Sequence, residues 1–247
     1  LYDQLLRPAA ARLAGRQRLV VIPDGALWEL PFQALSPRPG RYLVEDHSLS
    51  YAPSLTVLRE MRRRRQGAPA AAPQTLLAFG NPSLGETRQR QGLALMGGET
   101  LAPLPEAEQQ VRELARLYGG RGARVYVGAE ASEARAKAEA PRAQVLHFAT
   151  HGLLDGSDPL YSQQVLAAPG PGEGEDGLLE AREIMELDLS AELAVLSACE
   201  TGRGRVSAGE GLIGLSWAFF VAGVPSTVVS QWKVEAGSTA ALMLAFH

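Results

Sequence analysis

A histidine and a cysteine, two residues with complementary chemistry, each follow an apolar segment of the chain. His151 ends the segment V-L-H-F-A-T-H over 145–151, and the chain's one cysteine, Cys199, follows A-V-L-S-A over 194–198. A thiol is a weak nucleophile at neutral pH because its pKa is about 8.5, and a nearby imidazole activates it by taking the proton or stabilising the thiolate. The two residues therefore predict a cysteine–histidine dyad.

Short apolar segments alternate with helical patterns along the chain. Strands are predicted at 18–23, 75–79, 124–127, 144–148, 193–197 and 226–230, and helices at 2–14, 54–65, 106–118, 131–140, 180–186, 209–222 and from 236 onward. Several strands are apolar on both faces, which is typical of a mostly parallel sheet covered by helices. The predicted class is α/β, with a central sheet between two helical layers.

Such a sheet would bring the dyad together. The carboxyl ends of parallel strands share one edge, where open α/β folds bind ligands, and adjacent strands lie about 4.8 Å apart. If 144–148 and 193–197 are neighbours, His151 and Cys199 come within hydrogen-bonding reach. The backbone N–H groups of Gly152 and Cys199 are then candidate donors to the oxyanion that forms when a carbonyl is attacked.

Other functions remain open as alternatives. His147 and His151 have a spacing that would make a zinc site on a helix, but on a strand they lie about 13 Å apart, so we expect no metal and interpret His147 as a hydrogen-bonded core residue. The segment 209–214 (G-E-G-L-I-G) matches a dinucleotide motif, with Glu235 as a possible ribose ligand. Eleven residues (198–208) separate this motif from the preceding predicted strand, so nucleotide binding is a minor alternative.

Composition limits the partners and the compartment. The 247 residues are 46% hydrophobic and 21% charged with a net charge of −3, which predicts a globular chain and excludes a general electrostatic attraction to nucleic acid or membranes. A single cysteine indicates a reducing compartment, and we expect a cytoplasmic protein. The chain starts at Leu1 and stops within an apolar helical pattern, which predicts a piece of a longer polypeptide.

Two motifs and their flanks resemble a known family. The segments V-L-H-F-A-T-H-G (145–152) and L-S-A-C-E-T-G (196–202) are similar to the paired signatures of the CHAT domain, a caspase-like family related to separase and commonly found behind tetratricopeptide repeats. Residues 19–35, 51–54, 104–108 and 209–217 also resemble this family, so the resemblance covers almost the whole chain as one domain, 1–247.

The resemblance implies a caspase-hemoglobinase fold and cysteine endopeptidase activity on a protein substrate without a cofactor. His151 and Cys199 match the catalytic pair, and an upstream repeat region would act as sensor or platform. The caspase signature Q-A-C-R-G is absent around Cys199, so cleavage after aspartate does not follow. Asp155, Asp158 and Glu235 are candidates for substrate specificity. The alternative is a catalytically silent caspase-like domain that signals by docking.

Overall fold

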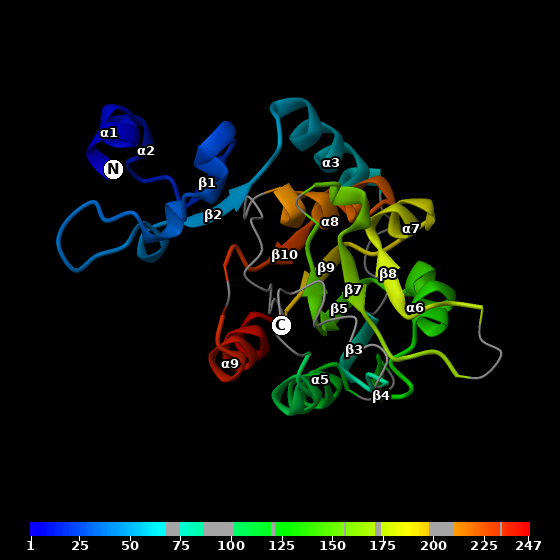
Figure 1. Cartoon of the computed structure of the whole chain (residues 1–247). Helices are drawn as coiled ribbons and strands as arrows, with labels where there is room; N and C mark the ends of the chain where they lie inside the picture. The colour runs from blue at the N-terminus through cyan, green and yellow to red at the C-terminus, as the bar shows by residue number, and fades with distance from the viewer. Residues whose placement is uncertain are drawn as a thin grey trace. The chain divides into compact units, whose positions relative to one another are not determined.

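The computed structural model describes residues 1–67, 75–85, 101–119, 122–155, 157–170, 174–197, 210–232 and 234–247. Contacts among them divide the chain into two compact units, Leu1–Arg64 and Arg65–His247 (Figure 1). Among the helices in these ranges, none has the length and apolar character needed to cross a lipid bilayer.

The smaller unit contains short elements around a parallel strand pair. Its helices are α1 (Tyr2–Leu5), α2 (Ala10–Leu13), most of α3 (Leu55–Gly67) and the 3₁₀ helices η1 (Arg7–Ala9), η2 (Gly25–Glu29), η3 (Phe32–Ala34) and η4 (Leu43–Glu45). Strand β1 (Arg18–Val21) pairs with β2 (Ser48–Tyr51). The single helix predicted over 2–14 is wrong: the 3₁₀ turn that contains Pro8 separates two one-turn helices, because proline has no backbone N–H to continue the ladder.

The larger unit is built on a parallel sheet of five described strands in the order β10-β9-β5-β3-β4. The strands are β3 (Leu76–Pro82), β4 (Ala123–Gly128), β5 (Val145–Ala149), β9 (Leu193–Leu196) and β10 (Thr227–Val229). Every pairing between them is parallel. The predicted α/β class with a mostly parallel central sheet is therefore confirmed, and the arrangement is that of a caspase-like fold.

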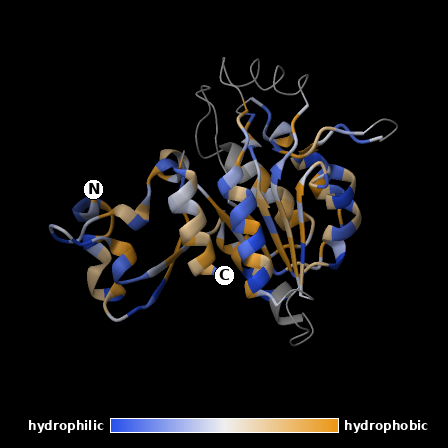
Figure 2. Ribbon diagram, turned by 90° about the horizontal axis from the view of Figure 1, so that it is seen from below, coloured by the Kyte–Doolittle hydropathy of each residue, from blue (hydrophilic) through white to orange (hydrophobic). Residues whose placement is uncertain are grey.

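Helices cover both faces of this sheet. One layer contains α5 (Pro105–Leu117) and α9 (Ala236–Phe246), and the other contains α6 (Glu133–Glu139), α7 (Ala181–Glu186) and α8 (Glu210–Val221), with the 3₁₀ helices η5 (Ala140–Arg142) and η6 (Pro159–Tyr161) beside them. The strands are strongly hydrophobic between these layers (Figure 2). Alternation along β5 sends Phe148 into the α6–α8 layer and Ala149 into the α5 layer.

Helix α5 lies very close to β3. Its buried residues Ala107, Gln110, Val111 and Leu114 follow the spacing of one helical face. A Cβ on Gly80 would meet a methyl group of Val111 at 2.7 Å, so glycine is what lets this helix approach the strand. This close packing fixes α5 against the edge where β3 ends.

A small antiparallel sheet follows β5. Strand β6 (Gly152–Leu153) pairs with β7 (Gln163–Val165), which pairs with β8 (Leu178–Glu180). The sequence predicts neither these strands nor β2, because none of them contains the run of consecutive β-branched or apolar residues that marks the predicted strands.

Candidate active site

The carboxyl ends of β5 and β9 lie side by side. The two strands pair in parallel, with Phe148 opposite Leu196. Their ladder continues by one step, because the Ser197 N–H donates to the Phe148 carbonyl at 2.8 Å. The prediction that these two strands are neighbours is confirmed, and the residues that follow them emerge at the same edge of the sheet.

His151 comes two residues after the end of β5 and is 1% exposed. Its Nε2 atom lies 2.7 Å from the carbonyl oxygen of Ala102. A carbonyl only accepts hydrogen bonds, so Nε2 carries the proton, and the lone pair of the neutral ring is on Nδ1. The backbone thus selects the tautomer in which Nδ1 is the basic atom.

Cys199 lies outside the described residues, as does Gly209 of the glycine motif. In the sequence Cys199 follows Leu196 by three positions, as His151 follows Phe148 by three, and Leu196 and Phe148 are opposite each other in the ladder. The placement of Cys199 beside His151 stays a prediction, and this matching count is the observation in its favour.

The strand that leads to Cys199 is fixed to α5 at its end. Gln110 Nε2 donates to Ser197 Oγ at 2.8 Å, and Ser197 Oγ lies 3.2 Å from Gln110 Oε1. Both residues are buried, at 3% and 6% exposed. A buried amide–hydroxyl pair of this kind costs free energy when either partner is lost, so it holds the end of β9 in one position.

Gly152 presents its N–H away from β7. The Val165 N–H donates to the His151 carbonyl at 2.8 Å, which makes residues 151 and 165 a hydrogen-bonded pair. The next pair, Gly152 and Gln164, is then a non-hydrogen-bonded pair of the antiparallel ladder. The Gly152 N–H therefore takes no part in the ladder with β7, as a donor to a ligand requires.

The three acidic candidates for specificity each hold local backbone. Asp155 Oδ1 accepts from the N–H groups of Ser157 and Asp158 and from the Ser157 hydroxyl, which together hold the pKa of Asp155 below its usual value. Asp158 Oδ1 caps η6, and Glu235 accepts from two N–H groups at the start of α9. Hydrogen bonds from this helix start also lower the pKa of Glu235. The lowered pKa values keep Asp155 and Glu235 negatively charged, and the contact of all three acidic residues with substrate stays a prediction.

His147 lies in the core, as predicted. Its Nδ1 atom is 3.0 Å from His247 Nε2, and His247 Nδ1 is 3.1 Å from the Tyr118 hydroxyl. Complete burial, and to a lesser extent the neighbouring His247, lowers the pKa of His147 to about 3. The ring is neutral at physiological pH and joins β5 to α9 and to the end of α5.

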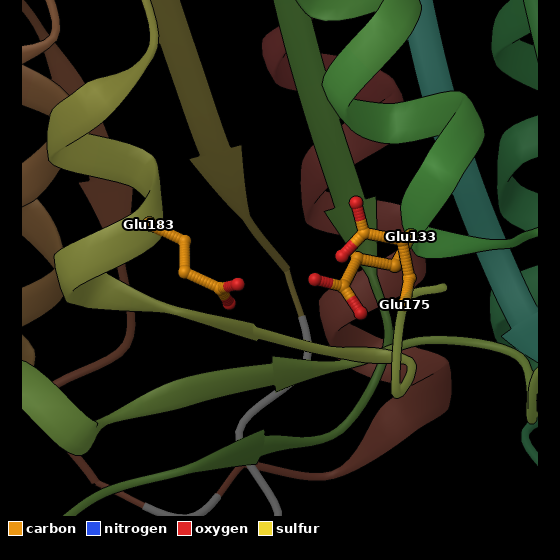
Figure 3. Close-up of side chains that lie close together, drawn as sticks. All are labelled: Glu133, Glu175 and Glu183. Carbon is orange, nitrogen blue, oxygen red and sulfur yellow. The ribbon is translucent and has the colours of Figure 1, made fainter. Parts of the chain in front are cut away.

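A cluster of carboxylates lies on the side of the sheet that α6 and α7 cover, opposite α5 and α9. Among the described His, Cys, Asp and Glu residues, the group close enough to hold a metal ion is Glu133, Glu175 and Glu183, whose side chains approach one another in Figure 3. Lys137 Nζ lies 2.7, 2.6 and 2.9 Å from their oxygens. An ammonium group already serves as the cation of this cluster, which ties α6 to the loop at 175 and to α7.

Sequence reasoning missed the residues that support His151 and the end of β9. Ala102 acts through its carbonyl, which every residue has, so no side-chain pattern marks it. It lies in the stretch 80–104, which carries no clear periodicity. Gln110 could have been found only as a polar residue on the buried face of α5, where an amide needs a partner.

Comparisons with known proteins identify the family of the chain. The model of the CHAT domain family matches residues 1–247. Tetratricopeptide repeat protein 28 from Homo sapiens is 27% identical over 290 residues, and the protein of the same name from Mus musculus is 27% identical over 289. Both alignments cover 100% of this chain and 11% of the relative, so the chain spans about a ninth of the length of these curated relatives. Since the family model covers the whole chain, the chain belongs to the CHAT domain family.

Proposed function

We propose that the chain is a cysteine endopeptidase that acts on a protein substrate, with Cys199 as nucleophile and His151 as acid–base. Membership in a family of caspase-like peptidases supports the reaction class. The observation that carries the proposal is the parallel pairing of β5 and β9, together with the hydrogen bond that keeps a proton on His151 Nε2, so that Nδ1 is the basic atom of the neutral ring. A base fixed in one tautomer at the same edge as a thiol is what nucleophilic catalysis needs.

The reaction begins when His151 Nδ1 accepts the Cys199 proton. The thiolate forms a bond to the substrate carbonyl carbon, and the π electrons of the carbonyl move to its oxygen. The imidazolium then returns its proton to the leaving nitrogen as the C–N bond breaks, which leaves a thioester on Cys199. A water molecule attacks this thioester while Nδ1 accepts its proton, and the acid product and free thiol are released.

Charge on the carbonyl oxygen needs donors in the transition state. The Gly152 N–H is one candidate because it does not pair with β7, and the Cys199 N–H is the other. In other enzymes, removal of one such donor raises the activation free energy by about 3 kcal/mol. The negative charges of Asp155, Asp158 and Glu235 favour a basic side chain on the substrate.

An upstream tetratricopeptide region is proposed as the sensor for this peptidase. The curated relatives are tetratricopeptide repeat proteins that are about nine times longer than the aligned segment. Control of the site by such a region predicts low activity until a partner binds.

Thiol reactivity and cleavage test the proposal together. The rate of Cys199 alkylation by iodoacetamide should fall about tenfold or more at pH 7 in His151→Ala, because the thiol returns to a pKa near 8.5. His47→Ala is the matched control, since His47 lies in the smaller unit, and its rate should equal that of the unchanged chain. Mass spectrometry of candidate partner proteins should find new termini that Cys199→Ala does not produce.

Two results would contradict the proposal. Equal cleavage by the unchanged chain and Cys199→Ala would exclude this cysteine as nucleophile. An alkylation rate that is slow and independent of His151 would instead support a non-catalytic domain that signals by docking.

A further inference from the structure

Asn81 has a backbone conformation that is uncommon for a residue with a side chain. Its φ angle is +46°, and it is the one non-glycine residue with positive φ in the described part of the chain. It lies at the end of β3, where the register with β4 shifts between Gly80 and Pro82. Such bulges and left-handed residues redirect side chains and often occur next to active sites.

The redirected side chain of Asn81 makes two hydrogen bonds to the start of α5. Its Oδ1 accepts from the Leu104 N–H at 2.7 Å, and its Nδ2 donates to Glu108 Oε2 at 3.0 Å. Glu108 is in turn bound by Arg112, whose guanidinium lies 2.8 Å from Oε1. These contacts, Asn81 first, lower the pKa of Glu108 and keep it an anionic acceptor.

Leu104 is only two residues from the carbonyl that holds His151. Ala102 and Leu104 are separated by Pro103, whose ring fixes its φ near −65° and restricts Ala102 to extended conformations. The link between the Leu104 N–H and the Ala102 carbonyl is therefore stiff. Movement of Leu104 moves the acceptor of His151 Nε2.

We infer that Asn81 is a positioning residue for His151: by binding the Leu104 N–H, it fixes the Ala102 carbonyl and so keeps the His151 ring protonated on Nε2. The inference rests on the proposed function for its catalytic meaning, but the tautomer of His151 is a property of the free protein. Asn81 binds the Leu104 N–H and Glu108 and acts on His151 through the backbone at 102–104.

Two variants separate this role from general support of the fold. Asn81→Gly keeps the left-handed backbone and removes both side-chain bonds. The double variant Asn81→Asp, Glu108→Gln keeps the left-handed backbone and an oxygen that accepts from the Leu104 N–H. The side chain at 108 then donates to the one at 81 instead of accepting from it, so two carboxylates do not face each other.

The test measures the His151 tautomer in the full chain labelled with ¹⁵N-histidine. His151→Asn identifies the His151 signals among those of the four histidines. We expect an Nε2-protonated ring in the unchanged chain, a mixture of tautomers in Asn81→Gly, and a return to the single tautomer in the double variant. Once a substrate is known, kcat should fall about tenfold or more in Asn81→Gly with little change in KM, because positioning of the base is lost rather than binding.

Two outcomes would overturn the inference. One is an unchanged His151 tautomer in Asn81→Gly. The other is a double variant that behaves like Asn81→Gly, which would mean that the Leu104 N–H acceptor is not what fixes the ring. Neither outcome depends on peptidase activity, whereas equal cleavage by Cys199→Ala would remove the proposed function and leave the positioning result intact.

Discussion

The hydrogen bonds between Gln110 and Ser197 are sensitive to the loss of either partner because both side chains are buried. We expect Gln110→Leu to lower the free energy of unfolding by about 1–3 kcal/mol, since the Ser197 hydroxyl is left without its partner. Combining it with Ser197→Ala should cost less than the sum of the two single changes. Urea denaturation of the four proteins measures this coupling, and strictly additive effects would show that the pair is not a unit.

His147 makes stability depend on pH in the acid range. Its pKa in the folded chain is about 3, whereas an unfolded histidine titrates near 6.5, so between these values the unfolded chain binds a proton that the folded chain excludes. Stability should therefore fall as the pH drops from about 6.5 toward 3, by at most roughly 4 to 5 kcal/mol from this group.

The variant His147→Asn removes that titration. Urea unfolding between pH 4 and 7 should show a shallower dependence on pH in His147→Asn than in the unchanged chain. Identical slopes in the two proteins would assign the acid sensitivity to other groups.

At the scale of single residues, sequence reasoning named the candidate groups for chemistry and missed the residues that hold them. His151 and Gly152 are marked by residue type and by their place after an apolar strand. Asn81 is distinguished by its backbone φ angle, and Ala102 acts through its carbonyl oxygen. Neither feature can be recognised from a pattern of side chains in the sequence. Positioning by backbone depends on tertiary contacts, which a single sequence does not display.

At the scale of elements, helix α8 depends on a glycine. A Cβ on Gly214 would lie 2.8 Å from both Cβ and the carbonyl oxygen of Pro159 in η6. The absence of a side chain at Gly214 therefore lets α8 pack closely against η6. Gly214→Ala should destabilise the chain by about 1–3 kcal/mol, although alanine favours helices.

Gly237 in α9 is the matched control for that change. Its added Cβ would meet only the flexible carboxylate of Glu235, at 3.1 Å, so Gly237→Ala should change stability by about 0.5 kcal/mol or less. Thermal unfolding of both variants compares the two sites. Equal stability of Gly214→Ala and the unchanged chain would show that α8 can move away from η6 without cost.

Lys137 joins α6, α7 and the loop at 175 through one ammonium group. Replacing it in Lys137→Met leaves the carboxylates of Glu133, Glu175 and Glu183 facing one another. We expect this change to lower the free energy of unfolding by about 2–4 kcal/mol at pH 7, where partial exposure of the cluster moderates the electrostatic repulsion. Because protonation removes the repulsion, the loss should shrink at pH 4. Urea unfolding at the two pH values measures it, and a loss that is the same at both would contradict an electrostatic cause.

Elements were predicted best where their pattern is long or strongly apolar. The five strands of the central sheet and helices α5 to α9 were all expected, with boundaries within a few residues. The small sheet β6-β7-β8 was missed because its strands lack the consecutive β-branched residues of the equally short β10 and owe their conformation to pairing partners rather than to local preference.

At the scale of the whole molecule, the two units have very different cores. The smaller unit buries Phe32, Leu35, Leu43 and Ala52 among its described apolar residues, whereas the larger one buries both faces of its sheet. We expect residues 65–247 to fold alone with cooperative unfolding and residues 1–64 to be unstable alone, because so few apolar side chains cannot offset chain entropy. Circular dichroism of each fragment during heating tests this, and a cooperative transition in 1–64 would contradict it.

The alternation of hydrogen bonds between β6 and β7 has a further consequence. Side chains and amides reverse direction at every residue of a strand. The direction of the Gly152 N–H therefore depends on whether the register of β6 against β7 changes by an odd or an even number of residues. A slip of β6 by one residue against β7 would keep both strands and their length but turn that amide inward, toward the neighbouring strand. A change in the length of the 154–162 connection therefore leaves the orientation of the Gly152 N–H unaltered only if β6 keeps its register against β7 or shifts by an even number of residues.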